Sequence, residues 1–273
     1  MSLNSVNTNT GAMVALQSLE ATASELTATQ KQVSTGYRVA DASDDGAAFA
    51  IAQGIRSTVG GLTSANQQLG NVTGLLNTTE TSLTGVSNLL SSFRDTLVQL
   101  SGNNVQPADA ANYQVTLKSD IQGIANLMNS SGYNGKSLLD GSAATIFVAQ
   151  DGSGGTYSIG AQSLTALTTT LATLTTAATA TTALMTTGGL ATLEKQVGTS
   201  LNQIGANINY VSSQTTFNSN KIDALNSGLG SLIDADLAKE SALLTALQIR
   251  QQLGTQALSL ANQAPQTLLS LFK

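Results

Sequence analysis

A long stretch of the chain that begins at Ile51 places apolar side chains at alternating steps of four and three residues. This spacing gathers them into one stripe along an α-helix, and only Thr58 and Thr79 interrupt the stripe. The stripe spans about fifty residues, or roughly 75 Å of helix at 1.5 Å per residue, which predicts a rod rather than a compact domain. Its positions are Ile51, Ile55, Thr58, Leu62, Ala65, Leu69, Val72, Leu76, Thr79, Leu83, Val86, Leu90, Phe93, Leu97 and Leu100.

Two further stripes predict the partners of this helix. One runs from Leu190 to Leu232, and a shorter one from Leu117 to Met128 follows the helix-breaking segment 102–107. A helix with one apolar stripe must bury that stripe against another element, so the three helices should form an antiparallel bundle. The longer partner carries Leu190, Leu193, Val197, Leu201, Ile204, Ile208, Val211, Thr215, Asn218, Ile222, Leu225, Leu229 and Leu232.

The two ends of the chain show the same spacing, and the C-terminal end shows it twice. A helix that is apolar on two sides must be covered on two sides. The N-terminal stripe is Leu16, Leu19, Ala23, Leu26, Gln30 and Val33. The two C-terminal stripes are Leu237, Leu244, Leu247, Leu258, Ala261 and Leu268, and Leu243, Ala246, Leu253, Ala257, Leu260, Ala264 and Leu271.

Charged residues are missing from both ends. None lies in the segment 1–19, and none lies between Arg250 and Lys273. An ion buried without a partner is costly, so a segment without ions can be covered by neighbours at little electrostatic cost. This pattern predicts that the two terminal helices pair with each other as a coiled coil and also contact other molecules.

The middle of the chain changes character. Residues 145–159 read as a β-hairpin with the loop Asp151–Gly155, and residues 165–187 contain 12 Thr and 6 Ala. We expect this middle to be exposed. The predicted fold is therefore mainly α, with segments 1–45 (N-terminal core helix), 46–143 (rod), 144–189 (hairpin and variable surface), 190–233 (returning rod helix) and 234–273 (C-terminal core helix).

Composition argues against several classes of function. The chain has no Cys and no His, which removes thiol chemistry, cysteine-bound zinc and the commonest acid–base side chain. The net charge is −5 without a basic run, so nucleic acid and anionic membranes are not expected partners. We expect no cofactor.

The segment Asp41–Gly46 begins like a calcium-binding loop, but Ala52 stands where the bidentate Glu belongs, so a helix-capping turn is favoured. The first residues lack the features of a cleaved secretory signal.

Several motifs at both ends resemble those of bacterial flagellin, the subunit of the flagellar filament. They are Leu3–Asn9, Ser34–Ala47, Asn134–Gly141, Asp234–Ser241 and Ala261–Leu271, each in the expected order. The stretch Gln251–Gly254 is most similar to alphaproteobacterial members.

The resemblance implies a secreted, extracellular structural protein that polymerises by coupled folding and association of its terminal helices. The implied partners are the chain itself, sibling flagellins, the flagellar export apparatus, a secretion chaperone, and the filament cap and junction proteins. We expect the polymerisation interface to include Leu16, Leu19, Leu26, Val33, Leu253, Leu258, Leu260, Leu268 and Leu271, with Arg38, Asp41 and Asp45 in inter-subunit ion pairs.

Other functions are open at this point. A hook–filament junction protein has similar termini but would polymerise poorly alone. A flagellin-like zinc protease needs a His-Glu-x-x-His helix, which a chain without His cannot supply. A secreted coiled-coil effector or adhesin would be a folded monomer with protected ends.

Overall fold

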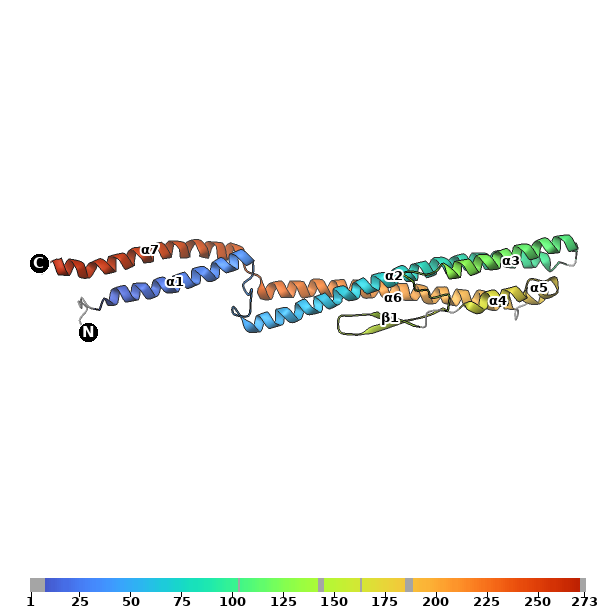
Figure 1. Cartoon of the computed structure of the whole chain (residues 1–273), viewed down its shortest axis with the longest axis horizontal. Helices are drawn as coiled ribbons and strands as arrows, with labels where there is room; N and C mark the ends of the chain where they lie inside the picture. Colours follow the sequence, from blue (N-terminus) through green and yellow to red (C-terminus); the bar gives the residue numbers. More distant parts are fainter. Residues whose placement is uncertain (1–7, 103, 142–144, 163, 185–188, 271–273) are drawn as a thin grey trace. The chain divides into compact units, whose positions relative to one another are not determined.

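The computed structural model describes residues 8–102, 104–141, 145–162, 164–184 and 189–270, which form helices and one two-stranded sheet (Figure 1). This confirms the mainly α fold with a small hairpin. In chain order the elements are α1 (Thr10–Thr35), α2 (Gly46–Leu100), α3 (Pro107–Asn129), β1 (Thr145–Ala149), β2 (Thr156–Gly160), α4 (Thr165–Thr173), α5 (Ala177–Leu184), α6 (Gly189–Ile233) and α7 (Leu237–Ser270).

The chain divides into two compact units, which are described separately. The terminal unit comprises the chain up to Ser57 and from Ala224 onward, and the central unit comprises Thr58–Asp223. The first turns of α2 and the last turns of α6 therefore group with the terminal helices. The finer division into five segments stays a prediction.

The long stripe of α2 forms the core of the central unit, as the sequence predicts. From Leu62 to Leu100 its apolar members are all buried, and Phe93 and Leu97 are fully enclosed. At the start of α2 the prediction is wrong, because Ile51 is 57% exposed while its neighbour Ala52 is completely buried. There the helix packs instead into a small cluster with Val39 and Ile233.

Helices α2 and α6 run antiparallel through the central unit, side by side (Figure 1). Arg94 near the end of α2 contacts Glu194 near the start of α6. Asn66 in the first half of α2 donates a hydrogen bond to Ser219 in the second half of α6. Asn218 is fully buried in the α6 stripe. Its amide donates to Asn66 Oδ1 at 3.0 Å and to the backbone carbonyl of Gln150 in the hairpin loop at 3.1 Å.

The hairpin packs on this core through one face. Strands β1 and β2 pair antiparallel with Ile146 opposite Ile159, and Val148 and Ile159 are buried in the main core. The Tyr157 ring stacks on that of Tyr210 of α6 with centroids 4.0 Å apart. The predicted loop between the strands is confirmed.

The described part of the Thr-rich segment, residues 165–184, forms two short helices and is partly buried, so the expectation of an exposed middle is wrong here. Leu167 and Leu171 of α4 and Ala180 of α5 are enclosed by the core. The Leu spacing explains this result: Leu164, Leu167 and Leu171 form one apolar face, while the Thr hydroxyls bond back to the helix, as Thr170 Oγ1 does to the carbonyl of Ala166.

In the terminal unit α1 and α7 lie side by side and antiparallel (Figure 1), which confirms the predicted pair of terminal helices. Helix α1 is capped at its C-terminus by Gly36, whose φ of 74° is in the left-handed region that glycine adopts without strain. Among the described helices, none is both long and apolar enough to cross a membrane.

Candidate subunit interface

The contact between α1 and α7 is built from small and branched side chains. Leu26 of α1 and Leu247 of α7 are buried in it, and Leu19, Val33 and Leu258 are half-buried. The predicted apolar stripes identify most of these buried and half-buried positions correctly.

Two positions of the predicted α1 seam are wrong. Gln30 is exposed and Leu16 is 45% exposed, while Thr22 and Thr29 are buried in their place. The Thr22 hydroxyl donates to the carbonyl of Ser18 at 2.9 Å, so its polar atom is satisfied within the helix and only its methyl group needs packing. Because Thr is polar, a pattern of apolar residues does not reveal that Thr22 and Thr29 are buried.

Helix α7 carries two apolar faces, as predicted, and only one of them meets α1. Leu244, Leu247, Leu258 and Ala261 are buried or half-buried against α1. The sequence predicts Leu237 on this face, but Leu237 is 49% exposed, since it is the first residue of the helix.

The second face of α7 is open. Leu253 is 60% exposed and Leu260 is 71% exposed, and Leu243, Ala246 and Ala257 of the same stripe are also exposed. Helix α1 adds Met13 and Val14, at 63% and 66%. We group six exposed apolar residues of α1 and α7 under the name terminal apolar surface: Met13, Val14, Leu16, Leu243, Leu253 and Leu260.

Within the chain, the predicted ion-pairing residues already have partners. Lys31 Nζ contacts Asp41 Oδ2 and Asp44 Oδ1, both at 2.7 Å. Asp45 Oδ1 accepts from the backbone N–H groups of Ala47 and Ala48 and caps α2. This confirms that the acidic turn is a helix cap.

Lys31 shifts the pKa values of two carboxyl groups in the turn. Its hydrogen bonds to the carboxylates lower the pKa of Asp41 and of Asp44 below the ordinary value of 3.8, and they raise its own pKa. Sequence reasoning missed Lys31 because it lies ten residues before Asp41, on the last turns of α1.

Arg38 ties the same turn to the end of α6. Its guanidinium donates to the carbonyl of Leu232 at 2.5 Å, and its backbone N–H donates to the carbonyl of Ile233 at 2.7 Å. The backbone of Tyr37 forms an antiparallel bridge with Asp234. Whether Arg38, Asp41 and Asp45 also meet a neighbouring subunit stays a prediction.

Two predicted interface positions belong to the end of the chain. The side chain of Leu268 and all of Leu271 lie outside the described residues, as does most of the motif Leu3–Asn9.

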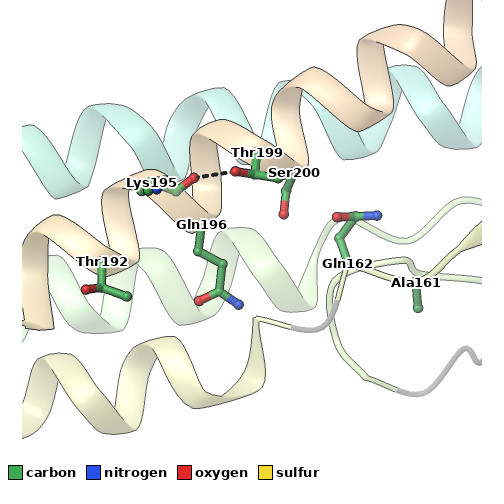
Figure 2. Close-up of a pocket in the computed structure, with 7 residues that line it drawn as sticks. All are labelled: Ala161, Gln162, Thr192, Lys195, Gln196, Thr199 and Ser200. Carbon is green, nitrogen blue, oxygen red and sulfur yellow. Dashed lines mark hydrogen bonds between the residues drawn. The ribbon is translucent and has the colours of Figure 1, made fainter.

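The central unit has a surface hollow of about 440 Å³ between the end of β2 and α6 (Figure 2). Its lining is Ala161, Gln162, Thr192, Lys195, Gln196, Thr199 and Ser200. Figure 2 shows the Thr199 hydroxyl turned to the backbone carbonyl of Lys195, at 2.9 Å. Lys195 is the one ionisable side chain of this lining, so the hollow holds no acid–base pair. In the described part of the chain, no group of three or more acidic residues is arranged to hold a metal ion.

Family models match both ends of the chain. The model of the bacterial flagellin N-terminal helical region matches residues 6–144, and that of the C-terminal helical region matches residues 188–272. Flagellin FljK of Caulobacter vibrioides is 36% identical over 279 residues and covers all of both chains. A flagellin of Brucella melitensis is 31% identical over 283 residues, covering 98% of this chain and 99% of its own. A crystal structure of Bacillus cereus flagellin aligns with a TM-score of 0.38 at 19% identity, over 65% of this chain and 94% of that one.

Proposed function

This chain belongs to the bacterial flagellin family, and we propose that its terminal helices reach their folded state only as neighbouring subunits cover them. It is a structural subunit of the extracellular flagellar filament, assembles with itself and other flagellins, and is not an enzyme. Both matching family regions describe flagellins, which favours a filament subunit over a hook–filament junction protein.

The observation that carries the proposal is the open second face of α7. Leu253 and Leu260 would each lose most of their water contact in a packed polymer, and burying one Leu side chain contributes roughly 1.5–3 kcal/mol. In a lone chain this gain is absent, while the entropy cost of ordering two helices remains.

The missing charges support the same mechanism. No ion within the segment 1–19 or 251–272 would have to be desolvated when neighbours close around α1 and α7. Assembly then stabilises the folded termini by mass action, because subunits bind the ordered state and not the disordered one.

Further partners belong to this proposal. Disordered termini suit passage through the flagellar export apparatus and capture by a secretion chaperone, and the ends of a filament need cap and junction proteins. These partners would recognise the same terminal segments that other subunits cover in the filament.

The test is a full-length chain compared with a variant lacking residues 258–273. We expect the truncated protein to remain soluble, to keep the central unit folded by circular dichroism, and to form no filaments in the electron microscope. Normal filaments from this variant would refute the proposed role of the C-terminal helix.

A second measurement addresses coupled folding directly. Hydrogen exchange on the soluble monomer should show fast exchange in α1 and α7 and slow exchange in α2 and α6. In filaments all four helices should be protected. Full protection of α1 and α7 in the dilute monomer would contradict coupled folding while leaving the family assignment intact.

A further inference from the structure

Asn9 uses both polar atoms of its side chain at the junction of the two terminal helices. Its Oδ1 accepts a hydrogen bond from the backbone N–H of Ala12 at 3.1 Å, which caps the start of α1. Its Nδ2 donates to the backbone carbonyl of Ala261 in α7 at 2.7 Å. One amide therefore joins positions 252 residues apart in the sequence.

The carbonyl of Ala261 is a special acceptor within α7. In an α-helix each carbonyl accepts from the N–H four residues later, and the residue four positions after Ala261 is Pro265, which has no N–H. The chain has only two prolines, Pro107 and Pro265, and Pro107 stands in the first turn of α3, where no helical hydrogen bond is lost. Pro265 thus leaves one carbonyl in the body of α7 without its helical donor.

We propose that Asn9 and Pro265 are a matched pair that sets the register of α1 against α7. Pro265 exposes a single backbone acceptor on α7, and Asn9 at the start of α1 supplies the donor for it. Ala261 is half-buried and lies on the face of α7 that meets α1, so the free carbonyl is presented to the partner helix rather than to open solvent.

This pairing discriminates between registers that the apolar seam alone tolerates. The seam consists of Leu, Ala, Thr and Val at similar spacing, so a slip by one helical turn, about 5.4 Å, exchanges one apolar contact for another. The same slip separates Asn9 from Ala261 and leaves a half-buried carbonyl without a partner. Asn9 is a positioning residue that completes the terminal unit.

The inference rests on the proposed coupling between folding of the terminal helices and assembly, so polymerisation reports on it. The full-length variants are Asn9→Ser, Pro265→Ala and the double variant. Serine keeps the helix cap but is too short to reach Ala261. Alanine at position 265 gives Ala261 its own helical donor.

We expect Asn9→Ser to raise the critical concentration for polymerisation about fivefold, the effect of one lost hydrogen bond. Pro265→Ala should not raise the critical concentration, and the double variant should match Pro265→Ala within about twofold, because the acceptor no longer needs Asn9. The critical concentration is measured by sedimentation of filaments from monomer at several total concentrations.

Rescue of Asn9→Ser by Pro265→Ala would separate loss of the Asn9–Ala261 hydrogen bond from general damage to α1. If Asn9→Ser has the same effect with proline and with alanine at position 265, or no effect with proline, the matched pair is refuted. A wild-type chain that forms no filaments would instead refute the proposed function.

Discussion

Gly61 of α2 and Gly152 of the hairpin loop touch backbone to backbone. A Cβ built on Gly61 would lie 2.9 Å from the Cα of Gly152 and 3.2 Å from its carbonyl oxygen. Two neighbouring contacts fix the same loop, because the carbonyl of Gln150 accepts from Gln214 Nε2 and from Asn218 Nδ2, both at 3.1 Å. The hairpin loop is therefore held on α2 by the close approach of the two glycine backbones, and on α6 by two hydrogen bonds from side-chain amides.

Gly61→Ala should therefore push the hairpin loop away from α2. The methyl group meets backbone, which cannot rotate aside, so we expect a loss of about 1–3 kcal/mol in the free energy of unfolding of the central unit. Thermal unfolding measures the loss, and hydrogen exchange should show faster exchange of the hairpin amides.

Gly60→Ala is the matched control for this prediction. A Cβ on Gly60 meets nothing within 4 Å, and alanine is the better helix former by about 1 kcal/mol. A neutral or stabilising result at Gly60 together with destabilisation at Gly61 supports the contact. Equal effects at both positions would contradict it.

Much of the fold could be predicted because apolar periodicity decides which face of a long helix is buried. Leu69, Val72 and Leu76 are spaced for the core and lie in it. Apolar periodicity mispredicts burial in two situations. Thr22 is polar but buried, because its hydroxyl donates a hydrogen bond within its own helix. Ile51 is apolar but exposed, because the start of α2 packs into a separate small cluster through other side chains.

The candidate interface could be predicted only in part. The second stripe of α7 is visible in the sequence, and the structure shows which of the two stripes stays open at Leu253 and Leu260. Asn9 and Lys31 could not be found, because their partners are set by tertiary geometry: one bonds a residue 252 positions away and the other a turn beyond the helix end.

Arg94 and Glu194 should contribute a measurable but small coupling between α2 and α6. The guanidinium and carboxylate form a two-pronged contact, with Arg94 Nε donating to Glu194 Oε1 at 2.7 Å and Nη2 to Oε2. Both side chains are partly exposed, at 43% and 29%, so solvent screens the pair. In a double-mutant cycle of Arg94→Met and Glu194→Gln, we expect a coupling of about 0.5–1 kcal/mol in urea unfolding.

Salt provides the check on that pair. The coupling should shrink when the cycle is repeated at about 1 M salt, where the Debye length is roughly 3 Å. Arg94→Lys should keep the charge but lose the two-pronged geometry and part of the coupling. A coupling that is zero at low salt, or unchanged at high salt, would contradict an electrostatic link.

Lys31 should make filament assembly sensitive to acid. In the folded turn its ammonium lowers the pKa of Asp41 and of Asp44, whereas in a disordered terminus these groups return toward 3.8. The assembled state then binds fewer protons, so this contribution is present above about pH 4 and is lost as the pH falls through the lowered values. Because the pKa of Lys31 is raised above 10.5, its contribution is lost only as the pH rises beyond that range.

The expected result is a critical concentration that is flat between about pH 5 and 9 and rises in acid. Lys31→Met should raise it at neutral pH and weaken its dependence on pH below about 4. Glu20→Gln, which removes a charge of α1 outside this turn, serves as the control. An acid profile of Lys31→Met identical to that of the wild type would show that the turn does not carry the effect.

Replacement of Leu253 and Leu260 by serine should impair assembly without harming the free subunit. Both side chains are largely exposed, so their loss removes little buried surface from the monomer, and thermal unfolding of the central unit should not change. In a polymer that covers them, each lost Leu should cost roughly 1–2 kcal/mol per subunit, a factor of about 5–30 in critical concentration.

Val115→Ser is the matched control, since Val115 of α3 is 67% exposed but belongs to the central unit. Sedimentation and electron microscopy should then show normal filaments for Val115→Ser and a raised critical concentration for each Leu variant. If the serine at position 115 impairs assembly as strongly as those at 253 and 260, the terminal apolar surface is not the dominant contact, and the open face of α7 needs another explanation.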